Sequence, residues 1–390
     1  MVTETNNAVI FYLINRVLDL TGKLLLVIIL FFCTTNVLFS FPLDKIVMLM
    51  LVVGLMVLHP NNQIFSAKEF ALLISVVIII SISSIANLIF FPMSFFPIVG
   101  LLFTIITSRF PGIILNSIYY ALLIHMILGI FFLISAYAGV PNHFVYSLLG
   151  KGFGIYSERG FTATVQTFGT LCLTWLLIYF LRRDLGINSF ADKIFFGINC
   201  LAILGTFNRS SFLFWMIIIF FKERKLFITV LTFFGLFLIK FWKQMIAFLL
   251  VTSSITARFE LLQGFDISFV QSHSLKVYLF GRGTNELTPE IVARVKWTNI
   301  KTIENGYAML LHTFGFVGLL FYISVSLYLV SMFIKIRKWA EACILMYFFF
   351  VTPYFTQEFV SVTFYFFLSV IFLTYNLNTD RLSKSYSLRK

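Results

Sequence analysis

The sequence is short of charge, of cysteine and of ligand-binding motifs. Only 12% of its 390 residues are charged, about half the share found in a soluble domain. All four cysteines fall within apolar segments, which argues against a disulfide-stapled domain and against a cysteine-based metal site. The sequence has no HExxH motif, no paired acids of the DxD type, no Walker motif and no dinucleotide-binding glycine motif. We therefore expect neither a metal ion nor any other cofactor.

Apolar residues fill the chain instead. Hydrophobic residues make up 60% of it, and phenylalanine alone accounts for 51 positions. The mean hydropathy is +0.97. This composition predicts an all-α, polytopic integral membrane protein in which residues 1–390 form a single transmembrane domain. We interpret the phenylalanines as lipid-facing and interhelical packing residues, with an aromatic substrate surface as the alternative.

The apolar runs predict about twelve membrane spans, since roughly 20 apolar residues cross a bilayer. The runs cover residues 23–41, 44–58, 69–91, 94–107, 111–138, 163–181, 192–207, 210–221, 226–249, 304–334, 340–355 and 358–377. The seventh and eighth runs are short enough to form one re-entrant hairpin, which would reduce the count to eleven or ten. Residues 7–20 predict an interfacial helix, because Arg16 and Asp19 interrupt their apolar face.

The net charge of +13 does not indicate nucleic-acid binding here. Lys and Arg collect in the cytoplasmic loops of membrane proteins, and this bias explains the charge. With both termini in the cytoplasm, the inner loops and tail carry Lys68, Arg109, Arg182, Arg183, Lys193, Lys222, Arg224, Lys225, Lys335, Arg337, Lys338, Arg381, Lys384, Arg389 and Lys390. The short outer loops carry mainly Lys45, Lys151, Arg159 and Arg209. This asymmetry favours one orientation over its inverse.

Two outer loops stand out, a smaller one at 139–162 and a larger one at 250–302. The larger is the only long polar stretch of the sequence. A large loop tied between two spans indicates that something is handled on that face, with a passive lid or linker as the alternative. Within it, residues 251–265 and 288–297 predict helices, separated by a glycine-containing turn at 279–287.

Cations recur along this predicted outer face, where the inside-positive bias disfavours them. They are Arg159, Arg209, Arg258, Arg282, Arg294, Lys296 and Lys301, with Lys240 and Lys243 near the outer end of the ninth span. An arginine at a bilayer boundary snorkels, pairs or binds an anion. The planar guanidinium group binds phosphate through paired, charge-assisted hydrogen bonds. The set therefore predicts a lipid-linked pyrophosphate, with ordinary anionic headgroups as the alternative.

Glu304 begins a long apolar run and is followed by Asn305 and a glycine. One interpretation is a helix N-cap, since the dipole and the free backbone N–H groups favour a carboxylate there. The other is a general base, because partial desolvation raises a carboxyl pKa toward neutrality, although nearby arginines oppose that rise.

Other titratable residues are weaker candidates for chemistry. His273 and Tyr307 are secondary candidates, and His312, two helical turns after Glu304, is expected to be packed or pore-facing. His125 lies in mid-span and is expected to be satisfied within the core. The two remaining acids of interest, Glu158 in YSERGF and Glu358 in TQEFV, are isolated in the sequence.

Five short stretches resemble one family of membrane enzymes. They are YSERGF with Arg159, FNRSSFLFW with Arg209, TARFELLQG with Arg258, LFGRGT with Arg282, and ENGYAMLLHTFGFVGLL with Glu304 and Asn305. Together with the span layout they resemble the bacterial O-antigen polymerases (Wzy type) and the related O-antigen ligases. Ligases usually place a histidine before the asparagine, where this chain has Glu304. That difference favours a polymerase and leaves the identity of the base open.

The resemblance implies a GT-C-like glycosyltransferase of the bacterial inner membrane with a large periplasmic loop and a periplasmic site. It implies transfer of a growing glycan from undecaprenyl pyrophosphate to the sugar end of an undecaprenyl-pyrophosphate-linked repeat unit, without metal or nucleotide. Arg209 and Arg258 would hold the donor pyrophosphate, and Arg159 and Arg282 would support them or hold the acceptor. Glu304 would take the acceptor proton. Besides membrane lipids, a flippase and a chain-length regulator of the same pathway are the expected partners.

Three other functions stay open at this point. A ligase would pass the glycan to a lipid A core. A lipid-linked oligosaccharide flippase fits the number of spans, but it needs cations along a path deep in the membrane, where the predicted spans are nearly free of charge. A non-enzymatic accessory protein is the third.

Overall fold

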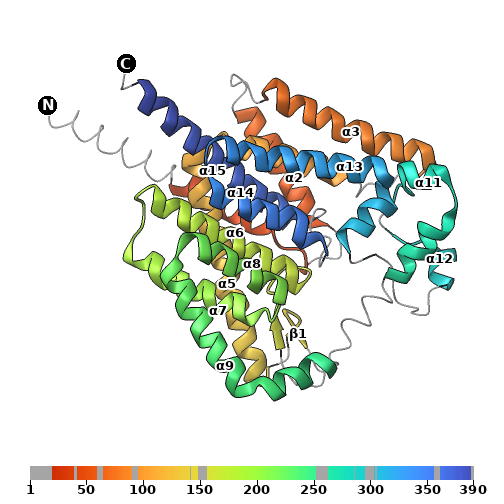
Figure 1. Ribbon diagram of the computed structural model, residues 1–390. Coiled ribbons are helices and arrows are strands. Elements are labelled where there is room, and N and C mark those ends of the chain that lie inside the picture. The colour runs from red at the N-terminus through yellow and green to blue at the C-terminus, as the bar shows by residue number, and fades with distance from the viewer. Residues whose placement is uncertain are drawn as a thin grey trace.

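The computed structural model describes residues 20–38, 42–58, 65–89, 95–140, 142–147, 156–251, 262–284, 286–294, 303, 305–354 and 361–387 (Figure 1). These residues are mainly helical, which confirms the predicted class of a helical membrane protein. Five helices are long and apolar enough to cross a membrane. They are Ala67–Asn87, Pro111–Tyr137, Val165–Asp184, Gly306–Lys335 and Val362–Thr379. The expected interfacial segment at 7–20 lies almost entirely outside the described residues.

Each of the twelve predicted runs coincides with a helical segment of the described chain. The first is Leu20–Cys33. The others are α2 (Leu43–Leu58), α3 (Ala67–Asn87), α4 (Phe96–Thr107), α5 (Pro111–Tyr137), α6 (Val165–Asp184), α7 (Phe190–Gly205), α8 (Arg209–Lys222), α9 (Arg224–Val251), α13 (Gly306–Lys335), α14 (Trp339–Met346, continued by a π-turn Tyr347–Val351 and a 3-10 turn Thr352–Tyr354) and α15 (Val362–Ser387). The large loop adds α11 (Leu275–Phe280) and α12 (Pro289–Arg294).

Local sequence signals set where several of these helices begin. Ser66, Thr164 and Ser189 are N-caps of α3, α6 and α7, and each forms a reciprocal capping box with the residue three positions later. Proline stands in the first turn of both α4 and α5. Such residues satisfy backbone N–H groups that have no partner within the helix, or lack the N–H altogether. The boundaries are therefore encoded in the sequence.

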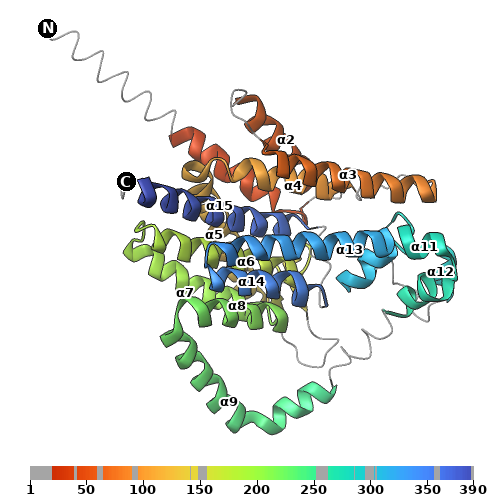
Figure 2. The same cartoon turned by 45° about the horizontal axis from the view of Figure 1, so that its top comes forward.

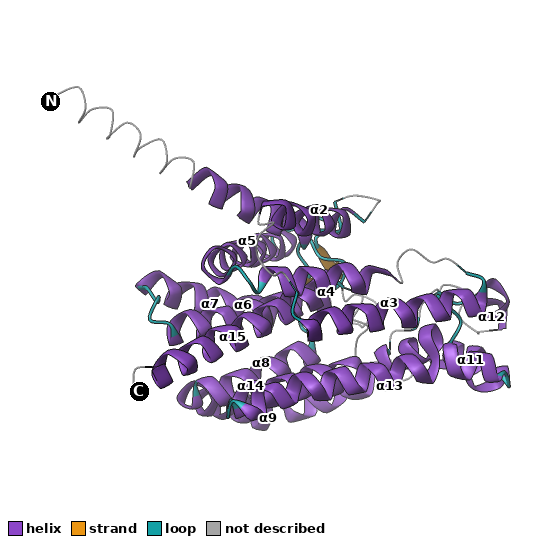
Figure 3. Ribbon diagram, turned by 90° about the horizontal axis from the view of Figure 1, so that it is seen from above, coloured by secondary structure: helices purple, strands orange, loops and turns teal. Residues whose placement is uncertain are grey.

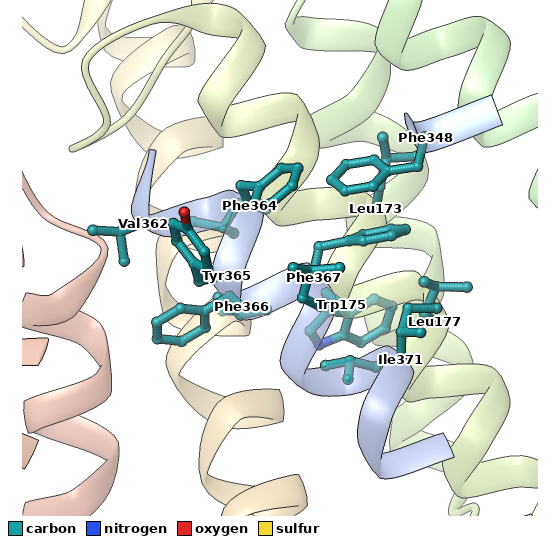
Figure 4. Close-up of a cluster of buried hydrophobic side chains, with 14 of the residues drawn as sticks. Leu173, Trp175, Leu177, Phe348, Val362, Phe364, Tyr365, Phe366, Phe367 and Ile371 are labelled. Carbon is teal, nitrogen blue, oxygen red and sulfur yellow. The ribbon is translucent and has the colours of Figure 1, made fainter. Parts of the chain in front are cut away.

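The centre of the bundle is α6, which packs against α5, α7, α8 and α15. Trp175 on α6 is fully buried, and its ring stacks on Tyr119 of α5 with centroids 5.1 Å apart. Figure 4 shows Phe348 and Phe367 packed beside Leu173, and the two phenylalanine rings stack at 3.9 Å. Most of the helices run along a common direction (Figure 3), and the aromatic rings fill the space between them.

The bundle has two distinct ends (Figure 1). We call the inner end the one with the turns that join α4 to α5, α6 to α7, α8 to α9 and α13 to α14. Ion pairs gather there. They are Arg109 with Glu69, Arg182 with Asp192, Arg183 with Glu223, and Lys222 with Glu341 and Asp184. Cations that the sequence assigned to the cytoplasmic face thus lie at one end of the bundle.

The opposite end, called the outer end, carries α11, α12 and the start of α13. It also carries a feature that the sequence did not predict, a two-stranded antiparallel sheet of β1 (Val145–Ser147) and β2 (Tyr156–Glu158) within the smaller loop. We call this pair the outer sheet. It packs on α5, and β2 also contacts α6 and α7. Figure 2 shows α9 curving away from the other helices on its way to this end.

The run at 304–334, expected as one span, is broken at Gly315. This residue has φ 64° and ψ −163°, and the two halves of α13 meet there at an angle (Figure 1). A Cβ on Gly315 would lie 2.5 Å from the carbonyl of Leu279, and a Cβ on Gly281 would lie 2.4 Å from the carbonyl carbon of Thr313. Only glycine tolerates this conformation and this contact, so the α11 segment seats in the break.

We expect Gly315→Ala to lower the melting temperature of the purified protein, because its cost of about 1–3 kcal/mol combines a strained φ with the overlap against Leu279. Gly54→Ala is the matched control, since nothing lies within 4 Å of the Cβ that would be added on α2. Thermal unfolding in detergent, followed by circular dichroism, measures both. Equal melting temperatures for the two variants would show that the break in α13 is not tightly packed.

Candidate functional site

Several predicted site residues lie outside the described residues. They include Glu304, the predicted base, and Arg258, one of the two predicted donor-binding arginines. The lysines Lys296 and Lys301 also lie outside. On α9, Lys240 is exposed, and Lys243 follows it on the same helix. The roles of these residues stay predictions, and the site is built below from the others.

Arg159 follows β2 directly and ties the outer sheet to the chain before β1. Its Nε donates a hydrogen bond to the backbone carbonyl of His143 over 3.1 Å, and its Nη2 donates to the same oxygen. The side chain is only partly buried. The guanidinium group is therefore held at the outer end with N–H groups to spare for an anion.

Glu158, the residue before Arg159, is the most unusual side chain of the described chain. It is 0% exposed, and neither carboxyl oxygen has a hydrogen-bond partner among the described residues. A Cβ on Gly129 of α5 would lie 2.2 Å from its Oε1, and a Cβ on Gly205 of α7 would lie 2.6 Å from its Oε2. The two glycines therefore supply the space that the carboxyl group fills.

Burial raises the pKa of Glu158 well above its usual value. A carboxyl group removed from water without a cation or a hydrogen bond favours its neutral form, because desolvation penalises the charged form. The sequence presented Glu158 as an isolated acid. The two glycines that enclose it lie 29 and 47 residues away along the chain, so no local pattern reveals the site.

Arg209 lies close to the same place along the chain. It is the first residue of α8, four residues after Gly205, and it is exposed. Asn208 caps α8 by accepting a hydrogen bond from the backbone N–H of Ser210 over 3.1 Å. A short turn, residues 206–208, thus joins α7 to Arg209 at the start of α8.

Arg282 belongs to a second polar group, at the break in α13. Its Nε donates to the carbonyl of Ser268 over 2.7 Å, and its backbone N–H donates to the carbonyl of His312 over 2.7 Å. The neighbouring Gly283 N–H donates to the carbonyl of Thr313 over 3.0 Å. Burial lowers the pKa of Arg282, and Glu290 opposes that shift. The loop thus satisfies carbonyls that the broken helix leaves open.

His312 is packed in this second group, as expected. It is 0% exposed. Its Nδ1 lies 2.9 Å from Ser268 Oγ, and its Nε2 lies 3.3 Å from the carbonyl oxygen of Glu286. Both ring nitrogens therefore have partners, and His312 holds the loop against α13 rather than offering a free base.

The start of α13 corrects the assignment of its cap. Asn305, not Glu304, is the N-cap, and its Oδ1 accepts from the backbone N–H of Ala308 over 3.0 Å. Its Nδ2 donates to the carbonyl of Tyr354 over 3.2 Å. Tyr307 donates from its hydroxyl group to the carbonyl of Phe350 over 2.9 Å. These residues tie the start of α13 to the end of α14, which makes Asn305 a positioning residue.

The predicted cations therefore fall into two groups rather than one. Arg159 directly follows the enclosed Glu158 and Arg209 begins α8, whereas Arg282 lies against the α13 break. No contact within the described ranges joins Arg282 to Arg159. His273, the exposed candidate in the large loop, follows the 3-10 turn Val270–Ser272 and precedes α11.

A cavity of about 320 Å³ opens at the inner end, away from these residues. Its walls come from α6, α8, α14 and α15, and its charged residues are Asp184, Lys222, Lys338 and Glu341. Lys222 Nζ lies 2.7 Å from Glu341 Oε1 and 3.7 Å from Asp184 Oδ2. The charged groups balance each other there, so we place the candidate site at the outer end despite this cavity.

The contact between Glu158 and Gly205 is testable by mutation. We expect Gly205→Ala to cost about 1–3 kcal/mol of stability, because the added methyl group overlaps Oε2. The cost falls when Glu158→Ala removes that oxygen. Gly197→Ala on the same helix is the control, since nothing lies within 4 Å of its added Cβ. Thermal unfolding of the four combinations measures the coupling, and strictly additive costs would contradict the contact.

The chain matches no family model, no curated protein and no solved structure. Its function is therefore inferred from its residues and from the geometry of the outer end.

Proposed function

We propose that the chain is an O-antigen polymerase of the bacterial inner membrane. In this proposal it transfers a growing glycan from undecaprenyl pyrophosphate to the non-reducing end of a lipid-linked repeat unit on the periplasmic face. The observation that carries the proposal is a pair of outer-end arginines: Arg159 has guanidinium N–H groups beyond those that bind His143, and Arg209 is exposed at the start of α8. Such groups suit the oxygens of a diphosphate beside a membrane.

The reaction requires two contributions from the protein, stabilisation of the charge on the leaving pyrophosphate and one base for the acceptor hydroxyl. The bond between the anomeric carbon of the donor glycan and the pyrophosphate oxygen breaks, and a bond forms from that carbon to the acceptor hydroxyl oxygen. The pyrophosphate leaves with its bonding electron pair, and arginine N–H groups stabilise the developing negative charge. The acceptor hydroxyl proton goes to a carboxylate, for which Glu304 is the candidate.

The described residues fit specific parts of this scheme. Arg159 has guanidinium N–H groups beyond those that bind His143, and Arg209 is exposed at the start of α8. Both suit pyrophosphate oxygens, with Arg258, Lys240 and Lys243 as further candidates. Asn305 fixes the start of α13 directly after Glu304, so it would position that carboxylate rather than react. The prenyl chains stay in the lipid, where their transfer costs nothing.

If Arg209 binds pyrophosphate, substitutions that remove its charge and substitutions that keep the charge but remove the guanidinium group have different effects on the rate. We expect Arg209→Ala to lower the polymerisation rate on the order of 10²-fold, because one transition-state donor is lost. Arg209→Lys keeps the charge but loses the fork, so it restores only part of the rate. Lys276→Ala, an exposed outer-end cation on α11, is the control and leaves the rate unchanged. A purified reaction with lipid-linked repeat units alone measures the rate, and full activity of Arg209→Lys would contradict bidentate binding.

Deletion of the protein in its bacterial host distinguishes a polymerase from the alternative functions. Loss of a polymerase leaves single repeat units on the finished lipopolysaccharide, loss of a ligase leaves long chains on the carrier, and loss of a flippase leaves no outer-face glycan. We expect the deletion to leave single repeat units, and we expect the wild-type chain to restore long glycan chains. We also expect Glu304→Gln to restore no long chains, since it keeps the shape of the side chain but not its basicity. Normal chain length with that variant would exclude Glu304 as the base.

A further inference from the structure

The enclosed carboxyl group of Glu158 has no role in the scheme above. It is fully buried, and both its oxygens lack hydrogen-bond partners among the described residues. Burying a polar group without a partner is unfavourable. Gly129, in the interior of α5, adds to this cost, because glycine in the middle of a helix is itself unfavourable. The fold thus accepts two unfavourable features at one point, which indicates a function for the group.

The place of Glu158 couples it to the outer sheet. It is the last residue of β2 and pairs with Val145 of β1. The sheet packs on α5, and β2 also contacts α6 and α7. The carboxyl group lies between Gly129 and Gly205 only while β2 is seated against these helices. Any displacement of β2 withdraws the group from its enclosure.

The surroundings of Glu158 supply little charge. Near it on the packed elements, the titratable or charged groups are His125 and Tyr137 on α5, Cys172 on α6, Cys200 on α7 and Tyr146 on β1, with Arg159 and Arg209 at the same end of the bundle. His125 is turned toward Thr34 and the carbonyl of Phe31, and Arg159 toward the carbonyl of His143. Burial is the cause of the raised pKa of Glu158, so the seated position favours the protonated form.

We propose that Glu158 is a proton-binding site that couples the seating of the outer sheet to proton uptake from the outer aqueous phase. In the seated state the side chain is a neutral carboxylic acid between two glycines. When the sheet lifts, the group enters water and releases its proton. The seated carboxylic acid thus becomes a carboxylate in the released state, and one H⁺ passes to the outer aqueous phase. The ligand of this site is a proton, and the proposal does not depend on the polymerase assignment.

The direction of the pH dependence follows from the raised pKa of the seated state. Below the ordinary carboxyl pKa of about 4.3, Glu158 holds the proton in both the seated and the released state. The free energy that favours the seated state is then at its maximum. Between that value and the raised pKa only the seated state holds it. The equilibrium constant for release therefore rises up to tenfold per pH unit. Above the raised pKa the dependence levels off, and seating is weakest.

Release of the sheet would also move Arg159. This residue follows Glu158 directly, and its side chain bonds the carbonyl of His143, just before β1. Lifting β2 would therefore change the position of a guanidinium group at the outer end. The pH of the outer aqueous phase would therefore control the position of the Arg159 guanidinium group relative to a bound anion.

Amide hydrogen exchange of the full-length protein in nanodiscs tests the proposal. After correction for the intrinsic exchange rate, we expect the protection of the amides of β1 and β2 to fall as the pH rises above the ordinary carboxyl pKa of about 4.3, by up to tenfold per pH unit. Glu158→Gln, which cannot titrate, keeps the sheet protected with no such slope. Amides within α6 serve as the internal control.

Two further measurements keep the test decisive if Glu158→Gln folds poorly. Glu158→Met preserves length without a titratable group, and it should also abolish the slope. Infrared spectroscopy of the wild type should show a protonated carboxyl band at neutral pH that is lost in Glu158→Met. The same slope in wild type and both variants would overturn the proposal, as would the absence of any slope in the wild type.

Discussion

A polar group inside an apolar bundle needs a partner, because no water is there to supply one. This constraint orders much of the described structure. Helix starts are satisfied by capping residues such as Ser66 and Thr164. The break at Gly315 is tolerated because loop N–H groups reach the carbonyls of His312 and Thr313. Irregular backbone inside a membrane protein survives only with such compensation, so the α11 segment and α13 form one unit.

Charge follows the same rule and divides the molecule into two ends. At the inner end, cations meet acids, as Lys222 meets Glu341 over 2.7 Å. At the outer end, Arg159 and Arg282 bond backbone carbonyls instead, which leaves their positive charge uncompensated by those bonds. Cations held in this way are suited to binding an anion, whereas at the inner end Arg109, Arg182, Arg183 and Lys222 are paired with acids. This contrast supports the choice of the outer end for the proposed pyrophosphate chemistry.

Several buried polar atoms of the described residues lack a hydrogen-bond partner, and Glu158 is the residue in which both side-chain oxygens do. Its neighbours show how this group is accommodated. Gly129 and Gly205 provide space but no hydrogen bond, so the group is stable there only without charge. In the proposed coupling, a neutral acid in this enclosure makes the packing of β2 sensitive to protons. The same end of the molecule thus combines fixed cations with one group whose charge depends on the position of the strand that carries it.

The sequence by itself determined the class of protein and where the helical runs lie, because hydropathy and capping residues act locally. It also placed Arg209 between two short apolar runs, and it left His312 open as packed or pore-facing. Only the tertiary structure decided that α13 breaks at Gly315, that Asn305 rather than Glu304 caps it, and that Arg282 lies apart from Arg159. It alone enclosed Glu158 between Gly129 and Gly205, because contacts between residues far apart in the chain arise only when the helices pack.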